Sequence, residues 1–352
     1  RSRYECRVME EPSPRSAAPT LQDPWLSRRI PLDGPVEQVR ATPRGHAVRA
    51  FVAGVLGLLA AFILFQLFVT PLATVALLFA KGVDFTALSG TDAMTRLFED
   101  NIRQLILGNS VGQVVGLAVV ALVLTRLHTS DLWSYLRLRR ADGVMLGLAL
   151  VGLIALTPVV QWLGAVNQSI PLPEFIESLE RSQMELIEKV LQGGLGVTFN
   201  VAMLAVVPAC CEELLFRGYA QRQFERGIGV VGGVLCSGII FGLYHLRLSQ
   251  ALPLSALGVY LAYLTWRTGS LWPAVIVHFA NNAFAVVAAN YAAQQPGLDA
   301  QALETMQVPW YILIPSAVAF GGLMYLLHGY ATTRLAQQPT RAPADDAPDR
   351  LS

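Results

Sequence analysis

Two adjacent glutamates and an arginine lie in an apolar part of the chain, in the segment Cys211-Glu212-Glu213-Leu214-Leu215-Phe216-Arg217. The run that precedes them, from Leu195 to Val207, carries no charged residue. A charged side chain in hydrocarbon is costly and is rarely kept there without a function. The sequence therefore predicts a functional site at this cluster.

The spacing within the cluster gives the two glutamates different roles. Glu213 and Arg217 are four residues apart, in the order that favours an ion pair, so each neutralises the other. Glu212 points about 100° away around the helix and has no local partner. An unpaired carboxylate away from water is a candidate general base.

Further polar residues repeat the same spacing in later apolar runs. His245 follows Phe241 by four residues, and Asn282 follows His278 by four, so each pair shares one helical face. These groups reach a common depth only if the helix that bears Glu212 continues to about Phe224 and turns at Gly227-Ile228-Gly229. We therefore predict that longer helix.

The elements that must position these residues are membrane helices. Hydrophobic residues make up 53% of the 352 residues, charged residues 14%, and the mean hydropathy is +0.46, which excludes an ordinary soluble domain. Runs of about 20 apolar residues can span a bilayer. Eight such runs predict an all-α, polytopic bundle of about eight transmembrane helices: 50–79, 105–124, 144–163, 195–207 and onward, 230–244, 251–266, 271–289 and 308–327.

Basic residues indicate how the bundle is oriented. With both termini in the cytoplasm, 20 of the 26 lysines and arginines fall on the inner side, among them Arg137, Arg139 and Arg140 in one loop. The abundance of arginine over lysine is typical of a GC-rich bacterial genome, so we expect a bacterial inner-membrane protein. The net charge of +1 gives no indication of a nucleic-acid partner.

Changes in composition divide the chain into six parts. The segment 165–194 holds a predicted amphipathic helix that opens at Pro171-Leu172-Pro173-Glu174 and ends at Gly193-Gly194. We expect it to lie on the outer membrane surface or to cap the bundle. The predicted parts are a disordered cytoplasmic tail (1–46), N-terminal transmembrane helices (47–164), an outer loop with this helix (165–194), a catalytic core (195–290), a last transmembrane helix (291–330) and a second disordered cytoplasmic tail (331–352).

Together the three motifs resemble those of the CPBP family of intramembrane proteases, which includes the CAAX prenyl endopeptidases and bacterial Abi proteins. The family patterns E-E-x-x-x-R, F-x-x-x-H and H-x-x-x-N correspond here to 212–217, 241–245 and 278–282. The resemblance covers about residues 195–290. It implies an endopeptidase in which Glu212, helped by His245, activates water, His278 and Asn282 stabilise the oxyanion, and Glu213, Arg217 and Phe241 give structural support.

The resemblance leaves the need for a metal open. Glu212, His245 and His278 could supply three ligands to a catalytic zinc. The chain has no H-E-x-x-H, and its four cysteines include no C-x-x-C. The same three side chains also suffice for a metal-free, glutamate-dependent mechanism, which we favour slightly.

Two other functions use the same kinds of residue. Intramembrane Glu, His and Asn also build ion and proton pathways, so an ion- or proton-coupled transporter is an alternative, although the chain shows no second copy of the Glu-Glu-Arg run. A non-catalytic immunity or scaffold protein on the same fold is another. The predicted partners are membrane lipid and a membrane-associated peptide or protein substrate, with no nucleic acid.

Overall fold

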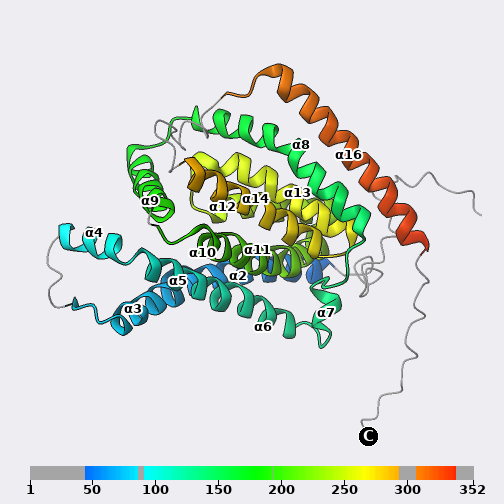
Figure 1. Ribbon diagram of the computed structural model, residues 1–352. Coiled ribbons are helices and arrows are strands. Elements are labelled where there is room, and N and C mark those ends of the chain that lie inside the picture. The colour runs from blue at the N-terminus through cyan, green and yellow to red at the C-terminus, as the bar shows by residue number, and fades with distance from the viewer. Residues whose placement is uncertain (1–43, 86–90, 193, 293–306, 338–352) are drawn as a thin grey trace, which may run out of the picture.

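The computed structural model describes residues 44–85, 91–192, 194–292 and 307–337, and this part of the chain is helical without strands (Figure 1). The helices fold as a bundle in which α12, α13 and α14 are central and α16 lies along α8 at the periphery. Their bounds are α2 (Arg44–Ile63), η1 (Leu64–Val69), α3 (Thr70–Ala80), α4 (Thr91–Asp100), α5 (Ile102–Gly112), η3 (Gln113–Val119), α6 (Val120–Arg126), α7 (Leu132–Tyr135), α8 (Gly143–Gln168), α9 (Glu174–Gln192), α10 (Val197–Val201), η4 (Ala202–Val206), α11 (Val207–Glu213), η5 (Leu214–Ala220), α12 (Gln221–Tyr244), η6 (Leu248–Gln250), α13 (Ala251–Thr268), α14 (Trp272–Ala292) and α16 (Trp310–Gln337).

Seven helical stretches in the described part are long and apolar enough to cross a membrane. The fourth, Val197–Tyr244, has 48 residues; as a straight helix it would measure about 72 Å, whereas the hydrocarbon core of a bilayer is about 30 Å thick. Gly229 breaks it with φ 80° and ψ 171°, a conformation reserved for glycine. The stretch therefore contains two of the eight predicted runs, and the predicted polytopic all-α fold and the turn at 227–229 are both confirmed.

Two prolines explain local widening of the helices. A proline lacks an N–H and its ring crowds the preceding turn, so the regular i→i−4 ladder cannot continue through it. The π-helical segments η1 and η4 lie immediately before the turns that contain Pro71 and Pro208. The chain is therefore π-helical just before Thr70-Pro71, and the long first span stays continuous.

Close backbone contact fixes the second leg of α12 against α13. A Cβ added at Gly238 would lie 2.4 Å from the backbone nitrogen of Val259, and one added at Gly242 would lie 2.7 Å from that of Ser255. Side chains at these two positions would force the helices apart. The leg that ends at His245 is thereby held at a fixed distance from its neighbour.

At the opposite end of α12, the loop predicted to be a basic topology signal contains a buried ion pair. Arg137 is 2% exposed and pairs with Glu225, which is also buried. Arg222 donates to the backbone carbonyls of Ser134 and Tyr135. Arg137 therefore fixes the α7 region to α12, a role that its place in a basic loop did not predict.

The predicted surface helix has the expected bounds, whereas the helices next to the two predicted tails extend into them. Helix α9 begins at Glu174 and ends at Gln192, as predicted, and it lies at one end of the bundle (Figure 1). Helix α2 starts at Arg44 and α16 continues to Gln337, so the boundaries predicted at 46 and 331 are shifted. The remainder of both predicted tails lies outside the described residues.

Candidate functional site

Glu213 joins two helices at the centre of the bundle. Its Oε1 accepts a hydrogen bond from Arg217 Nη1 at 2.8 Å and another from His278 Nδ1 at 2.8 Å. All three side chains are at most 3% exposed. The predicted Glu213–Arg217 pair is confirmed, whereas the contact with His278 was missed because the two residues are 65 positions apart in the sequence.

Glu212 lies next to Glu213 on α11 and faces His245 and His278, which come from other helices. Its Oε2 lies 3.9 Å from His245 Nε2 and 4.0 Å from His278 Nε2. This oxygen is buried, and no donor of the described chain reaches it. Separations of this size exceed a direct hydrogen bond and match groups bridged by one water. The carboxylate and both imidazoles therefore converge on one small polar space, as the spacing and depth argument predicted.

His245 is oriented by its own helix. Its Nδ1 lies 2.8 Å from the carbonyl oxygen of Phe241, one turn earlier. A carbonyl can only accept, so Nδ1 carries the proton. In the neutral imidazole, Nε2 then presents a lone pair toward Glu212.

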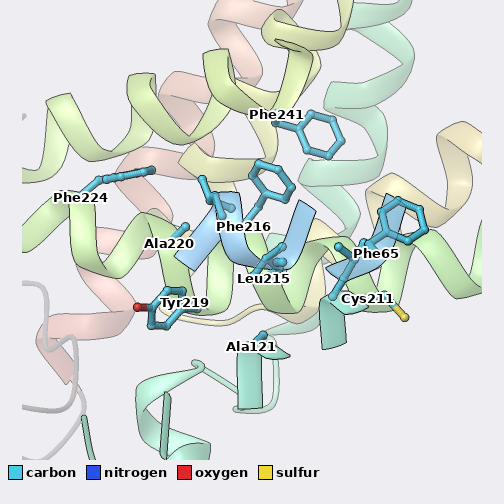
Figure 2. Packing of buried hydrophobic residues seen from close by; sticks show 12 residues of the cluster. Phe65, Ala121, Cys211, Leu215, Phe216, Tyr219, Ala220, Phe224 and Phe241 are labelled. Carbon is cyan, nitrogen blue, oxygen red and sulfur yellow. The ribbon is translucent and has the colours of Figure 1, made fainter. Parts of the chain in front are cut away.

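The Phe241 ring packs against three polar side chains of the site. It is 1% exposed and meets the rings of His245 and His278 edge to face, with centroids 4.8 and 5.6 Å away. The Arg217 guanidinium carbon lies 4.2 Å from the centroid of the same ring, a cation–π contact. Figure 2 shows Phe241 beside Phe216 in the hydrophobic cluster that surrounds this part of the chain. Phe241, which the resemblance implied as a structural support, thus contacts three of the site residues.

Asn282 lies one turn beyond His278 on α14 and is half-buried. Its Oδ1 accepts a hydrogen bond from Asn281 Nδ2 at 3.2 Å. The structure contains no hydrogen bond between Asn282 and Glu212 or either histidine. Its role in oxyanion stabilisation therefore stays a prediction.

The donor atoms do not form a metal site. No group of three His, Cys, Asp or Glu side chains in the described residues is arranged to hold a metal ion. The separations of 3.9 and 4.0 Å from Glu212 to the histidines exceed the about 3.3 Å between ligand atoms of tetrahedral zinc, whose bonds are about 2.0–2.1 Å long. The metalloprotease alternative, with Glu212, His245 and His278 as ligands, is not supported.

Two polar residues outside the three motifs contact the loop that follows His245. Glu180 of α9 and Asn167 of α8 both bond to the backbone around Leu248. Sequence reasoning missed them because Asn167 lies at the end of an apolar run and Glu180 lies on the presumed polar face of a surface helix. The only available signal was their residue type.

Comparisons with known proteins find similarity in the part of the chain that carries this site. Residues 194–284 match the family model described as type II CAAX prenyl endopeptidase Rce1-like. A curated relative, the "Putative membrane peptidase YdiL" of Bacillus subtilis (strain 168), is 25% identical over 191 residues, which are 53% of this chain and 75% of that protein. The assignment to the CPBP family of membrane proteases is thus supported. No solved structure matches the chain significantly.

The segment matched by the family model contains all three motifs. It begins just before α10 and ends within α14, so it includes Glu212, His245 and His278. With the seven apolar helices, the comparisons support an integral membrane protein of the protease class.

Proposed function

We propose that this protein is an intramembrane endopeptidase in which Glu212 and His245 activate a water molecule for attack on a peptide carbonyl. The observation that carries the proposal is the buried Glu212 Oε2, which lies 3.9 and 4.0 Å from two imidazole nitrogens. A hydrolase needs an acceptor for the proton of its water at such a position.

The orientation of His245 supports the activation step. A water in this space can donate one hydrogen to Glu212 Oε2 and the other to His245 Nε2, because both atoms are acceptors. Its lone pairs then point away from both groups, toward a substrate. Attack forms the C–O bond as Glu212 takes a proton, and the same proton passes to the leaving nitrogen when the C–N bond breaks.

His278 and Asn282 are the proposed oxyanion donors. Because His278 Nδ1 donates to Glu213, its Nε2 can donate only when the ring is an imidazolium. The Glu213 carboxylate stabilises that positive charge and fixes the ring, as a carboxylate does for a catalytic histidine elsewhere. Asn282 can supply a neutral N–H from the next turn of α14.

The proposed substrate is a membrane-associated peptide or protein, since the site lies among apolar helices. The family model is named for CAAX prenyl endopeptidases. We extend only its reaction class, peptide-bond hydrolysis, to this chain, and propose the bacterial inner membrane as its location.

The test is cleavage of membrane-anchored peptides by the purified full chain in detergent and in liposomes, with products identified by mass spectrometry. We expect wild-type cleavage and a loss of at least about a hundredfold in Glu212→Ala and His245→Ala. Glu177→Ala, an exposed glutamate on α9, is the control and should cleave normally. Equal rates for wild type and Glu212→Ala would refute the mechanism.

A further inference from the structure

The backbone directly after His245 has an unfavourable conformation. The second leg of α12 ends at Tyr244, His245 caps it, and Leu246 follows with φ 54°. This left-handed position after a helix is normally occupied by glycine, because a side chain there meets the backbone. A leucine in this conformation persists only where surrounding contacts hold it.

Two side chains from other helices supply such contacts. Glu180 Oε1 accepts from the Leu248 N–H at 2.6 Å, and Oε2 accepts from the Ser249 N–H at 3.3 Å. Asn167 donates from Nδ2 to the Leu248 carbonyl at 2.9 Å and accepts at Oδ1 from the Leu252 N–H at 2.7 Å. Glu180 therefore binds two backbone N–H groups of the loop between His245 and α13, and Asn167 binds one of its backbone carbonyls.

These bonds do the work of a helix cap that the loop itself lacks. Gln250, the residue that precedes α13, makes no capping bond with its side chain. The first N–H groups of a helix need acceptors, and a negative charge is favourable beside them. Asn167 of α8 supplies such an acceptor to the Leu252 N–H of α13, and Glu180 of α9 supplies acceptor oxygens to the Leu248 and Ser249 N–H groups of η6, the short helix that leads into α13.

The burial pattern of α9 shows that Glu180 is directed to this loop. Glu180 is 8% exposed, whereas Phe175 and Leu179 on the same helix are 70% and 48% exposed. Burial of a carboxylate beside exposed apolar residues reverses the usual amphipathic pattern. Its hydrogen bonds to the loop offset that cost.

We propose that Glu180 and Asn167 are positioning residues that hold His245 at its working distance from Glu212. The inference rests on the proposed function, because it assigns to these residues the placement of the histidine that activates water. The histidine needs this help because it lies just past Tyr244, the last residue of α12, so along the chain only the preceding helical turn supports it. A small displacement of a catalytic group costs a large factor in rate.

The first test compares Glu180→Ala, Glu180→Gln and the control Glu177→Ala in the peptide-cleavage assay. We expect kcat to fall by about ten- to a hundredfold in Glu180→Ala with little change in KM, since substrate contacts are intact. Glu180→Gln retains an acceptor oxygen and should recover most of the rate. If Glu180→Ala does not fold, Asn167→Ala replaces it, because it removes the bonds that α8 makes to the same loop. We expect the same fall in kcat for this variant.

The second test does not depend on activity. Modification of His245 by diethyl pyrocarbonate is measured by mass spectrometry in the Glu212→Ala background, relative to the exposed His128 near the other end of the bundle. We expect Glu180→Ala to raise the relative rate at His245 severalfold, by loosening the loop, and Glu177→Ala to leave it unchanged.

The two tests separate the two proposals. Failure of the wild-type protein to cleave any peptide would overturn the proposed function, whereas the modification experiment would still report whether Glu180 holds His245. An unchanged kcat together with an unchanged modification rate in Glu180→Ala and Asn167→Ala would overturn the positioning role. A loss of kcat in Glu180→Ala with no change in the modification rate at His245 would show that Glu180 acts in some way other than holding His245, and would also overturn it.

Discussion

The Glu213 carboxylate gives the sharpest prediction about this site, because it bonds both to Arg217, a structural partner, and to His278, a proposed oxyanion donor. In Glu213→Gln, Arg217 stays fully buried but loses its counter-charge. Leaving one member of a buried ion pair without its partner lowers the free energy of unfolding by about 3–5 kcal/mol. For domains of 150–250 residues each kcal/mol lowers the unfolding midpoint by about 2–4 °C, so a fall of about 10 °C is expected.

The double variant Glu213→Leu/Arg217→Met separates the two roles. Replacing both charges by apolar side chains of similar volume is often neutral for stability. The midpoint should therefore return to within a few degrees of the wild type. Activity should not return, because the leucine side chain offers His278 Nδ1 no acceptor in place of the carboxylate oxygen that lies 2.8 Å away in the wild type, whereas Glu213→Gln keeps a neutral acceptor but loses the negative charge. We expect both variants to cleave about 10²- to 10⁴-fold more slowly.

The assays are thermal unfolding in detergent and peptide cleavage on the same preparations. Arg217→Met alone provides the matched control, because it leaves the Glu213–His278 contact in place. Recovery of both stability and activity in the double variant would refute the reasoning, since Glu213 would then serve only to neutralise Arg217. An unchanged midpoint in Glu213→Gln would contradict the burial of the pair.

Four further predictions follow from the geometry. Glu212→Gln should lose activity but keep or gain stability, measured by unfolding midpoint, because its buried Oε2 has no donor to lose; a clear fall in stability would contradict this. Gly229→Ala should destabilise the protein by about 1–3 kcal/mol, measured by the same unfolding, because its φ of 80° excludes a side chain; an equally stable variant would show that the turn tolerates other conformations. Cleavage should persist after chelation and removal of metal, whereas loss of activity that zinc restores would revive the metal-bound alternative. A reporter fused after Arg226 should be found in the cytoplasm, and its appearance outside would reverse the predicted orientation.

Much of the site could be predicted from local spacing. The i,i+4 rule places Glu213 with Arg217 and leaves Glu212 unpaired, because side chains four residues apart share a helical face. Matching depths across three helices then required a turn near Gly229, which is where the helix breaks. Each step uses only the fixed rise and pitch of a helix.

Contacts between helices could not be predicted in this way. That Glu213 holds His278, that Glu225 pairs with Arg137, and that Glu180 reaches the loop after His245 depend on which helices become neighbours. Residues 65, 88 and 68 positions apart leave no periodic signal in the sequence. A charged residue on a predicted polar face, such as Glu180, has the same pattern whether it meets water or a buried loop.

The sequence by itself thus determined the class of the fold, the membrane setting and the list of reactive side chains, because hydrophobicity and helical period act locally along the chain. Only the tertiary structure decided which nitrogen of each histidine faces Glu212, which carboxylate holds His278, and which distant side chains fix the loop after His245. Those properties depend on distances between helices. Such distances are set by packing contacts, including the close approach of α12 and α13 at Gly238.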